Sequence, residues 1–201
     1  MPFVRQLSGL DASFLHLENS RTFGHVSGLA LYSRPSADFD PYEVVYRRFE
    51  ALAGHVGPLH EKLLDVPLGL DHPYWVVDDD FDLDYHIRHL GLAPPGDDNQ
   101  LAEQVARIFG RALDRSRPLW EVYVIEGLHD GRWALMTKFH HSSIDGGAGV
   151  VMLNMLTDPD PDASSALAPI PIEPEELPSG AQLAQRAVAK IAADPVKAIR
   201  L

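Results

Sequence analysis

The sequence predicts a domain that combines helices with strands, because two hydrophobic periods alternate along its 201 residues. In segments such as 41–53, apolar residues recur every three or four positions, which is the period of a helix. In segments such as 132–140 they recur at every second position, which is the period of a strand. A hydrophobic fraction of 45% provides enough apolar side chains for a substantial core.

The first helix signal begins at Ser8, whose hydroxyl group can cap a helix over residues 10–18. Three of its apolar residues recur at helical spacing and lie on one face: Leu10, Phe14 and Leu17. Residues 23–32 then alternate in the manner of a strand.

The next elements are a helix and a short strand. Asp40 followed by Pro41 is a strong start signal, and the helix is expected to run to about Ala53. It directs four apolar or aromatic residues toward the core: Tyr42, Val45, Phe49 and Leu52. Residues 74–77 predict the strand.

The acidic stretch 78–84 allows two interpretations. Carboxylates at alternate positions can ligate calcium, but the stretch lacks the glycine and the final glutamate of an EF-hand loop. Because Phe81 and Leu83 alternate as in an edge strand, and acidic runs are usually solvated, we favour a solvated edge. His86 and His89 follow at a spacing that is wrong for a helical zinc pair, so we expect structural histidines.

Residues 98–156 predict the local order helix, loop, β-hairpin, histidine-bearing turn and helix. Asp98 or Asn99 caps the first helix, whose apolar residues are Leu101, Val105, Ile108 and Ala112. A strand over 120–125, a turn at 129–131 and a return strand over 132–140 form the hairpin. An apolar, helix-like run follows at 148–156.

The turn that follows the return strand has the strongest chemical character. His141 continues the alternation of the apolar face of that strand, so we expect its ring to point where Phe139 points. An imidazole at a strand end, beside a turn that needs glycine, suits a general base near neutral pH. Asp145 either fixes the tautomer of the imidazole or holds the turn together.

The composition excludes several classes of function. A net charge of −12 argues against a general nucleic-acid binder, which needs a basic surface. The absence of cysteine rules out disulfides, thiolate catalysis and cysteine-based zinc sites. Residues 1–8 lack the apolar core of a signal peptide, and no apolar run approaches the roughly 20 residues that span a bilayer. We therefore expect a cytoplasmic protein, with peripheral contact to membranes or lipid droplets as the second option.

The character of the chain changes after Leu156. Six of the 16 prolines lie between residues 159 and 178, which is typical of a linker that is extended or disordered. A helical stretch resumes beyond Gly180. We expect an N-terminal domain over 1–157, a proline-rich linker over 158–180, and a helical segment over 181–201 that begins the crossing to a second domain.

Four segments carry a specific resemblance. The stretch His140-His141-Ser142-Ser143-Ile144-Asp145-Gly146 matches the HHxxxDG motif of the CoA-dependent acyltransferase superfamily. Residues 7–15, 80–86 and 113–121 add a narrower match. In this order the four segments resemble the N-terminal half of the bacterial wax ester synthase/diacylglycerol acyltransferases, of the mycobacterial triacylglycerol synthase type.

The resemblance implies an α/β fold in which a mixed β-sheet is flanked by helices, as one half of a two-domain, chloramphenicol-acetyltransferase-like architecture. It implies an O-acyltransferase that moves a fatty acyl group from acyl-CoA to diacylglycerol, which yields triacylglycerol, or to a long-chain alcohol, which yields a wax ester. It implies no permanently bound cofactor and no metal, with acyl-CoA as the donor substrate. The expected partner chain is the C-terminal half of the same enzyme.

The resemblance also implies roles for single residues. His141 is the general base, His140 is its motif neighbour, Asp145 is structural, and Gly146 lets the backbone approach closely. Ser142 or Ser143 is a candidate donor to the oxyanion, and nothing in the sequence selects either. A structural role is expected for the segment Pro118, Leu119, Trp120 and Glu121.

Two rival functions belong to other classes. A Ser-His-Asp hydrolase needs a nucleophile elbow of the G-x-S-x-G kind, and the sequence contains no such pattern. The second rival is a catalytically incomplete half-domain that binds lipid or a partner chain without turnover.

Overall fold

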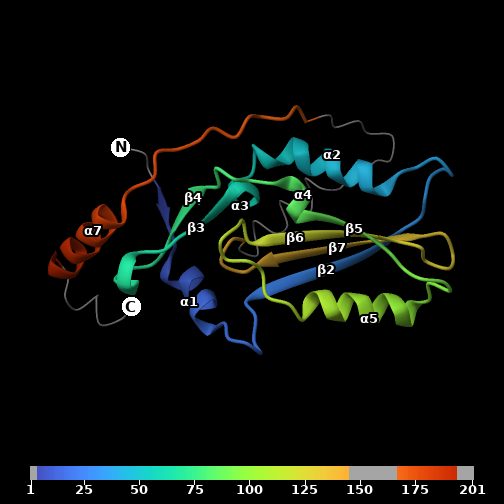
Figure 1. Ribbon diagram of the computed structural model, residues 1–201, viewed down its shortest axis with the longest axis horizontal. Helices are drawn as coiled ribbons and strands as arrows, with labels where there is room; N and C mark the ends of the chain where they lie inside the picture. The colour runs from blue at the N-terminus through green and yellow to red at the C-terminus, as the bar shows by residue number, and fades with distance from the viewer. Residues whose placement is uncertain (1–3, 145–166, 194–201) are drawn as a thin grey trace.

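The structure is a computed structural model, and it describes residues 4–144 and 167–193. Two β-sheets lie next to each other, with helices packed around them (Figure 1). The larger sheet has the strand order β2-β7-β6-β5, and the smaller sheet has the order β1-β4-β3. The larger sheet carries the residues of interest at one of its ends.

The larger sheet is mixed, as the resemblance implies. Its strands are β2 (His25–Tyr32), β5 (Ile87–Gly91), β6 (Trp120–Glu126) and β7 (Trp133–His140). β7 is antiparallel to both of its neighbours, whereas β5 runs parallel to β6. The register places His25 opposite His140 and Trp120 opposite Phe139.

A helix covers each face of this sheet (Figure 1). On one face, helix α2 (Pro41–Ala53) buries Val45, Phe49 and Leu52 against the sheet. On the other face, helix α5 (Asp98–Phe109) buries Leu101 and Ile108. Both faces of the sheet are therefore apolar, and a separate hydrophobic core lies on each face.

The smaller sheet is packed against a different helix. Its strands, all antiparallel, are β1 (Arg5–Gln6), β3 (Glu61–Leu64) and β4 (Tyr74–Val77). Helix α7 (Gly180–Ala193) packs Leu183 and Ala187 against this sheet. The remaining short elements are α1 (Gly9–Leu17), α3 (Gly57–His60), η1 (Pro67–Gly69) and α4 (Leu83–His86).

Two of the three expected helix caps are confirmed. Ser8 accepts from the backbone N–H of Asp11, and Asp40 accepts from that of Glu43. The third cap is Asp97, so the prediction of Asp98 or Asn99 was wrong. Asp97 and Gln100 form a capping box that satisfies two free N–H groups reciprocally, and this advantage selects the residue one position earlier.

The buried face of α1 is not the face on which the sequence places Leu10, Phe14 and Leu17. Ala12 and Leu15 are buried, whereas Leu10 is 70% exposed and Leu17 is 68% exposed. Leu15 and Ala12 pack with Leu7, Trp75, Leu113 and Leu119. Helical spacing alone allows either face, and the small Ala12 lets the helix approach this cluster closely.

The acidic stretch 78–84 is a turn followed by the short helix α4, and the predicted edge strand was wrong. Asp82 caps α4 by accepting from the N–H of Asp84, and this local bond competes with an extended backbone. Asp78 is buried and accepts from Lys62 at 2.7 Å, whereas Asp79 is exposed. His86 is fully buried and donates from Nδ1 to the carbonyl of Trp120 at 2.7 Å, which is a structural role.

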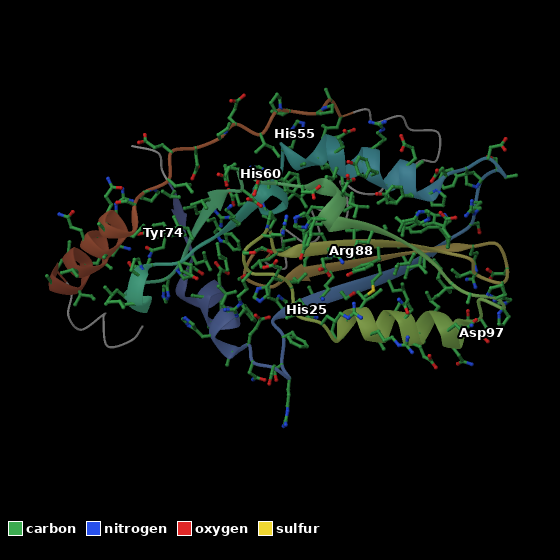
Figure 2. All side chains as sticks on the ribbon, in the orientation of Figure 1. His25, His55, His60, Tyr74, Arg88 and Asp97 are labelled. Carbon is green, nitrogen blue, oxygen red and sulfur yellow. The ribbon has the colours of Figure 1, made fainter. Side chains whose placement is uncertain are left out.

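Residues 167–179, part of the predicted linker, contain neither helix nor strand and run across the end of α2 toward α7 (Figure 1). A ring nitrogen of His55, labelled in Figure 2, lies 2.9 Å from the carbonyl oxygen of Ala168. A Cβ on Gly54 would lie 2.0 Å from the carbonyl oxygen of Ile170. Only glycine allows this close passage.

Several expectations fall outside the described residues: those for Asp145, Gly146 and the helix-like run 148–156, and the domain boundary at 157. Helix α7 coincides with the start of the predicted helical segment. Within the described parts of the chain, no helix is long and apolar enough to cross a bilayer.

Candidate active site

The candidate site lies where β7 ends and β2 begins, beside α1 (Figure 1). The last residue of β7 is His140, whose N–H donates to the carbonyl of Leu119 at 3.0 Å. Because the strand ends here, its alternation does not extend to His141. The expectation that His141 points with Phe139 into the core is therefore corrected: its ring stacks on Phe14 of α1 instead.

His140 is fully buried, and its ring is hydrogen-bonded within the turn. Its Nδ1 lies 3.1 Å from the backbone nitrogen of Ser142 and 2.6 Å from the Ser142 hydroxyl. A backbone N–H can only donate, so Nδ1 accepts and the proton of the neutral ring is on Nε2. Burial lowers the pKa of His140, and this outweighs the nearby Glu18 carboxylate, which raises it. His140 is thus neutral near pH 7, with one defined tautomer.

His141 is arranged differently. Its ring is half-buried and stacks on Phe14, with centroids 4.8 Å apart and an interplanar angle of 19°. Its backbone N–H donates to the carbonyl of Gly24 at 2.8 Å. Among the described residues, neither ring nitrogen of His141 has a hydrogen-bond partner. Of the two adjacent histidines, only His141 combines an accessible ring with nitrogens that have no partner in the described part of the chain.

Gly24 belongs to the site, and the sequence did not indicate it. A Cβ at this position would lie 2.7 Å from Nε2 of His140 and 3.0 Å from the carbonyl oxygen of Phe14. The backbone at Gly24 thus passes close to the ring of His140. The carbonyl of Gly24 accepts from the backbone N–H of His141, the residue after His140. A larger residue would displace a fully buried ring.

The two serines of the turn both use their hydroxyl groups locally. Ser142 is buried against Nδ1 of His140, and the Ser143 hydroxyl donates to the His140 carbonyl at 2.8 Å. Both bonds stabilise the turn that presents His141. The assignment of Ser142 or Ser143 to substrate binding stays a prediction.

The segment 118–121 is buried throughout, and its structural role stays a prediction. Glu121 faces a fully buried lysine, Lys138, whose Nζ lies 3.7 Å from the glutamate carboxylate. Lys138 also donates to the carbonyls of Ile108 and Arg111 at the end of α5. The Tyr123 hydroxyl donates to Glu121 at 2.8 Å. In this cluster the Glu121 carboxylate offsets the positive charge of Lys138, which has no access to water.

Two residues at the edges of the sheet face this buried cluster. Arg88 of β5 lies 3.6 Å from Glu121, and His25 of β2 lies 2.8 Å from the carbonyl of Phe109 (Figure 2). Among the described residues, no group of three or more His, Asp or Glu side chains is arranged to hold a metal ion.

Buried histidines make the stability of the chain dependent on pH. Burial lowers the pKa of His25, His86 and His140 below the ordinary value of 6.5. Below pH 6.5 the unfolded chain binds more protons than the folded one, so stability present above that pH is lost as the pH falls. We expect the melting temperature to fall as the pH is lowered from 8 to 5, measured by thermal melts across that range.

The exposed His129 provides the control for this prediction. His129→Ala is expected to leave the pH dependence unchanged, whereas His86→Phe is expected to reduce it. A melting temperature that stays constant from pH 8 to pH 5 would show that these histidines titrate normally in the folded state.

Solved structures define the class of fold. The first condensation domain of the calcium-dependent antibiotic synthetase aligns with a TM-score of 0.61 at 18% identity, over 77% of this chain and 36% of that chain. The wax ester synthase/diacylglycerol acyltransferase from Marinobacter aquaeolei VT8 aligns with a TM-score of 0.68 at 33% identity, over 94% of this chain and 47% of that chain. The expected α/β fold, one half of such an architecture, is confirmed.

The family follows from the sequence comparison. The family model of the wax ester synthase/diacylglycerol acyltransferase catalytic domain matches residues 7–200, so the chain belongs to this family. The probable diacylglycerol O-acyltransferase tgs3 of Mycobacterium tuberculosis is 41% identical over 155 residues, which are 77% of this chain and 57% of that protein. A putative diacylglycerol O-acyltransferase of the same species is 38% identical over 181 residues, which are 89% of this chain and 38% of that protein. The chain therefore spans about half the length of these relatives.

Proposed function

We propose that the chain supplies the base-bearing half of an O-acyltransferase, which moves a fatty acyl group from acyl-CoA to diacylglycerol or to a long-chain alcohol. One observation carries the proposal: of two adjacent histidines, His140 is fully buried and hydrogen-bonded within the turn, whereas His141 has a half-buried ring whose nitrogens have no hydrogen-bond partner among residues 4–144 and 167–193. The family of the chain and the printed activity of its relatives support the reaction class.

The proposed reaction is a direct transfer. His141 removes the proton of the acceptor hydroxyl as its oxygen attacks the thioester carbonyl carbon. The resulting tetrahedral oxyanion collapses, the carbon–sulfur bond breaks, and the new ester keeps the carbon–oxygen bond. The proton held by His141 then passes to the leaving CoA thiolate, which restores the base. No acyl group is attached to the protein at any step.

The stack on Phe14 helps this role. An aromatic ring that is parallel to the imidazole restricts its rotation without a hydrogen bond to either nitrogen. The base is therefore oriented without the use of either nitrogen by the described residues. Orientation of this kind contributes to catalysis because the acceptor hydroxyl and the base must meet in a defined geometry.

The second half of the active site is also a proposal. Because the chain spans about half the length of its relatives, we propose that a C-terminal half completes the acyl-CoA site and encloses His141. The acceptors are insoluble in water, so contact with a membrane or lipid-droplet surface is part of the proposal. The exposed Leu10 and Leu17 on α1, the helix that carries Phe14, are suitably apolar for such contact.

Thiol release from palmitoyl-CoA, with diacylglycerol as the acceptor, tests the function. The chain would be assayed alone and together with the C-terminal half of a related enzyme. His141→Ala is expected to lower the rate about 10²- to 10⁴-fold, which is the usual contribution of a general base. His129→Ala, a change of an exposed histidine in the hairpin turn, is the matched control and should have full activity.

Two results would contradict the proposal. If the pair is active and His141→Ala has no effect, the base lies elsewhere. If neither sample releases thiol although both are folded, the rival interpretation of a half-domain that binds lipid or a partner without turnover is favoured.

A further inference from the structure

We propose that Glu18, held by Arg115, is a positioning residue that sets the geometry of the turn bearing His141. The inference rests on the proposed function only for its catalytic consequence. Glu18 directly follows α1, and its side chain is 11% exposed. Neither residue was singled out in the sequence as part of the site.

The carboxylate of Glu18 uses both of its oxygens. Oε1 accepts from the N–H of Gly24 at 2.8 Å and lies 3.1 Å from Nε2 of His140. The contact with His140 is close but outside the geometry of a well-aligned hydrogen bond, so it is mainly electrostatic. Oε2 accepts from Nε and Nη2 of Arg115 at 3.0 Å and 2.6 Å. One side chain thus joins the residue before β2, the last residue of β7 and the loop before β6.

The protonation states of Glu18 and His140 agree with those contacts. Burial raises the pKa of Glu18, but the Gly24 N–H and Arg115 outweigh it, so the net pKa is lowered and the carboxylate is ionised near pH 7. The Nε2 proton of His140 faces this carboxylate, because Nδ1 accepts from Ser142. A negative oxygen at Oε1 therefore favours the tautomer that the turn requires.

Two routes connect Glu18 to His141. The first runs through the backbone of Gly24, whose N–H is bound by Glu18 and whose carbonyl binds the N–H of His141. The second runs through α1, because Arg115 also donates to the carbonyl of Leu15, next to the Phe14 that stacks on His141. The backbone and the ring of the proposed base are both placed by groups that Glu18 and Arg115 hold.

The alternative is that the Glu18–Arg115 ion pair only stabilises the fold. Arg115 is 46% exposed, and exposed ion pairs contribute little to stability. The two roles predict different outcomes for Glu18→Gln, which has nearly the same shape. In either orientation of the amide, its NH₂ group faces a donor, either Arg115 or the Gly24 N–H and Nε2 of His140. The change therefore disturbs the turn more than the fold.

The test has a structural readout that needs no acyl transfer. In the chain with labelled histidines, NMR reports the ring-current shift of His141 from Phe14 and the tautomer of His140. Glu18→Gln is expected to reduce that shift and to mix the tautomers, with little change in melting temperature. Glu103→Gln, which removes an exposed pair with Arg107 on α5, is the matched control and should change neither signal.

The catalytic readout uses the assembled enzyme. Glu18→Gln is expected to lower kcat about 10- to 100-fold with KM nearly unchanged, as misplacement of a base does. Arg115→Lys, which keeps the charge but not the two-pronged contact, should show an intermediate loss. If Glu18→Gln does not fold, Arg115→Lys decides the question by the same NMR signals.

The outcomes separate this inference from the proposed function. Unchanged His141 and His140 signals in Glu18→Gln would overturn the inference, whatever the activity. Loss of the stacked signal supports it even if no acyltransferase activity is found, in which case the proposed function alone fails.

Discussion

Replacement of Trp120 with alanine is expected to lower the free energy of unfolding by about 3–5 kcal/mol. Trp120 is 1% exposed and belongs to the core between α2 and the larger sheet. Its ring stacks on His86 and Phe49, with centroids 4.4 Å and 5.1 Å away. Its Nε1 donates to the carbonyl of Leu59 at 2.9 Å, so the change leaves a cavity and an unpaired acceptor together.

Chemical denaturation of the chain, followed by circular dichroism, measures this change. Leu68→Ala is the control, because Leu68 is 94% exposed and should show no change beyond about 0.5 kcal/mol. A cost below about 1 kcal/mol for Trp120→Ala would mean that the core closes over the missing ring, against the packing seen here.

Replacement of Glu121 with glutamine is expected to destabilise the chain by a similar amount, about 3–5 kcal/mol. The change keeps the size of the side chain but removes the carboxylate that faces Lys138, which is fully buried. Lys138 then keeps the neutral carbonyls of Ile108 and Arg111 but loses the negative charge of Glu121, so the cost of its buried charge is no longer balanced.

A double-mutant cycle tests this explanation. Lys138→Met removes the buried charge, so Glu121→Gln is expected to cost much less in that background than alone. If the two costs simply add, the lysine and glutamate do not depend on each other, and the buried pair is not the cause. The melting temperatures of the four chains, measured at one pH and salt concentration, provide the comparison.

The sequence determined those features that depend on local patterns. Residue spacing predicted α2, most of α5 and the hairpin of β6 and β7, because in these segments the apolar period and the turn or cap residues agree. The HHxxxDG stretch at 140–146, with its companion segments, predicted the family that the comparisons confirm. β5 was missed because its five residues, Ile87–Gly91, have no clear alternation and pair with β6 across a distant part of the chain.

Only the tertiary structure decided how the two histidines differ. Adjacent in sequence, they are distinguished by what surrounds them: Glu18 and Ser142 enclose the ring of His140, whereas Phe14 supports the ring of His141. The choice of the buried face of α1 and the requirement for glycine at position 24 have the same origin. Both depend on contacts between segments far apart in the chain, which no local period or spacing encodes. The motif thus predicted His141 as the base, and packing showed how the surroundings of the two imidazoles differ.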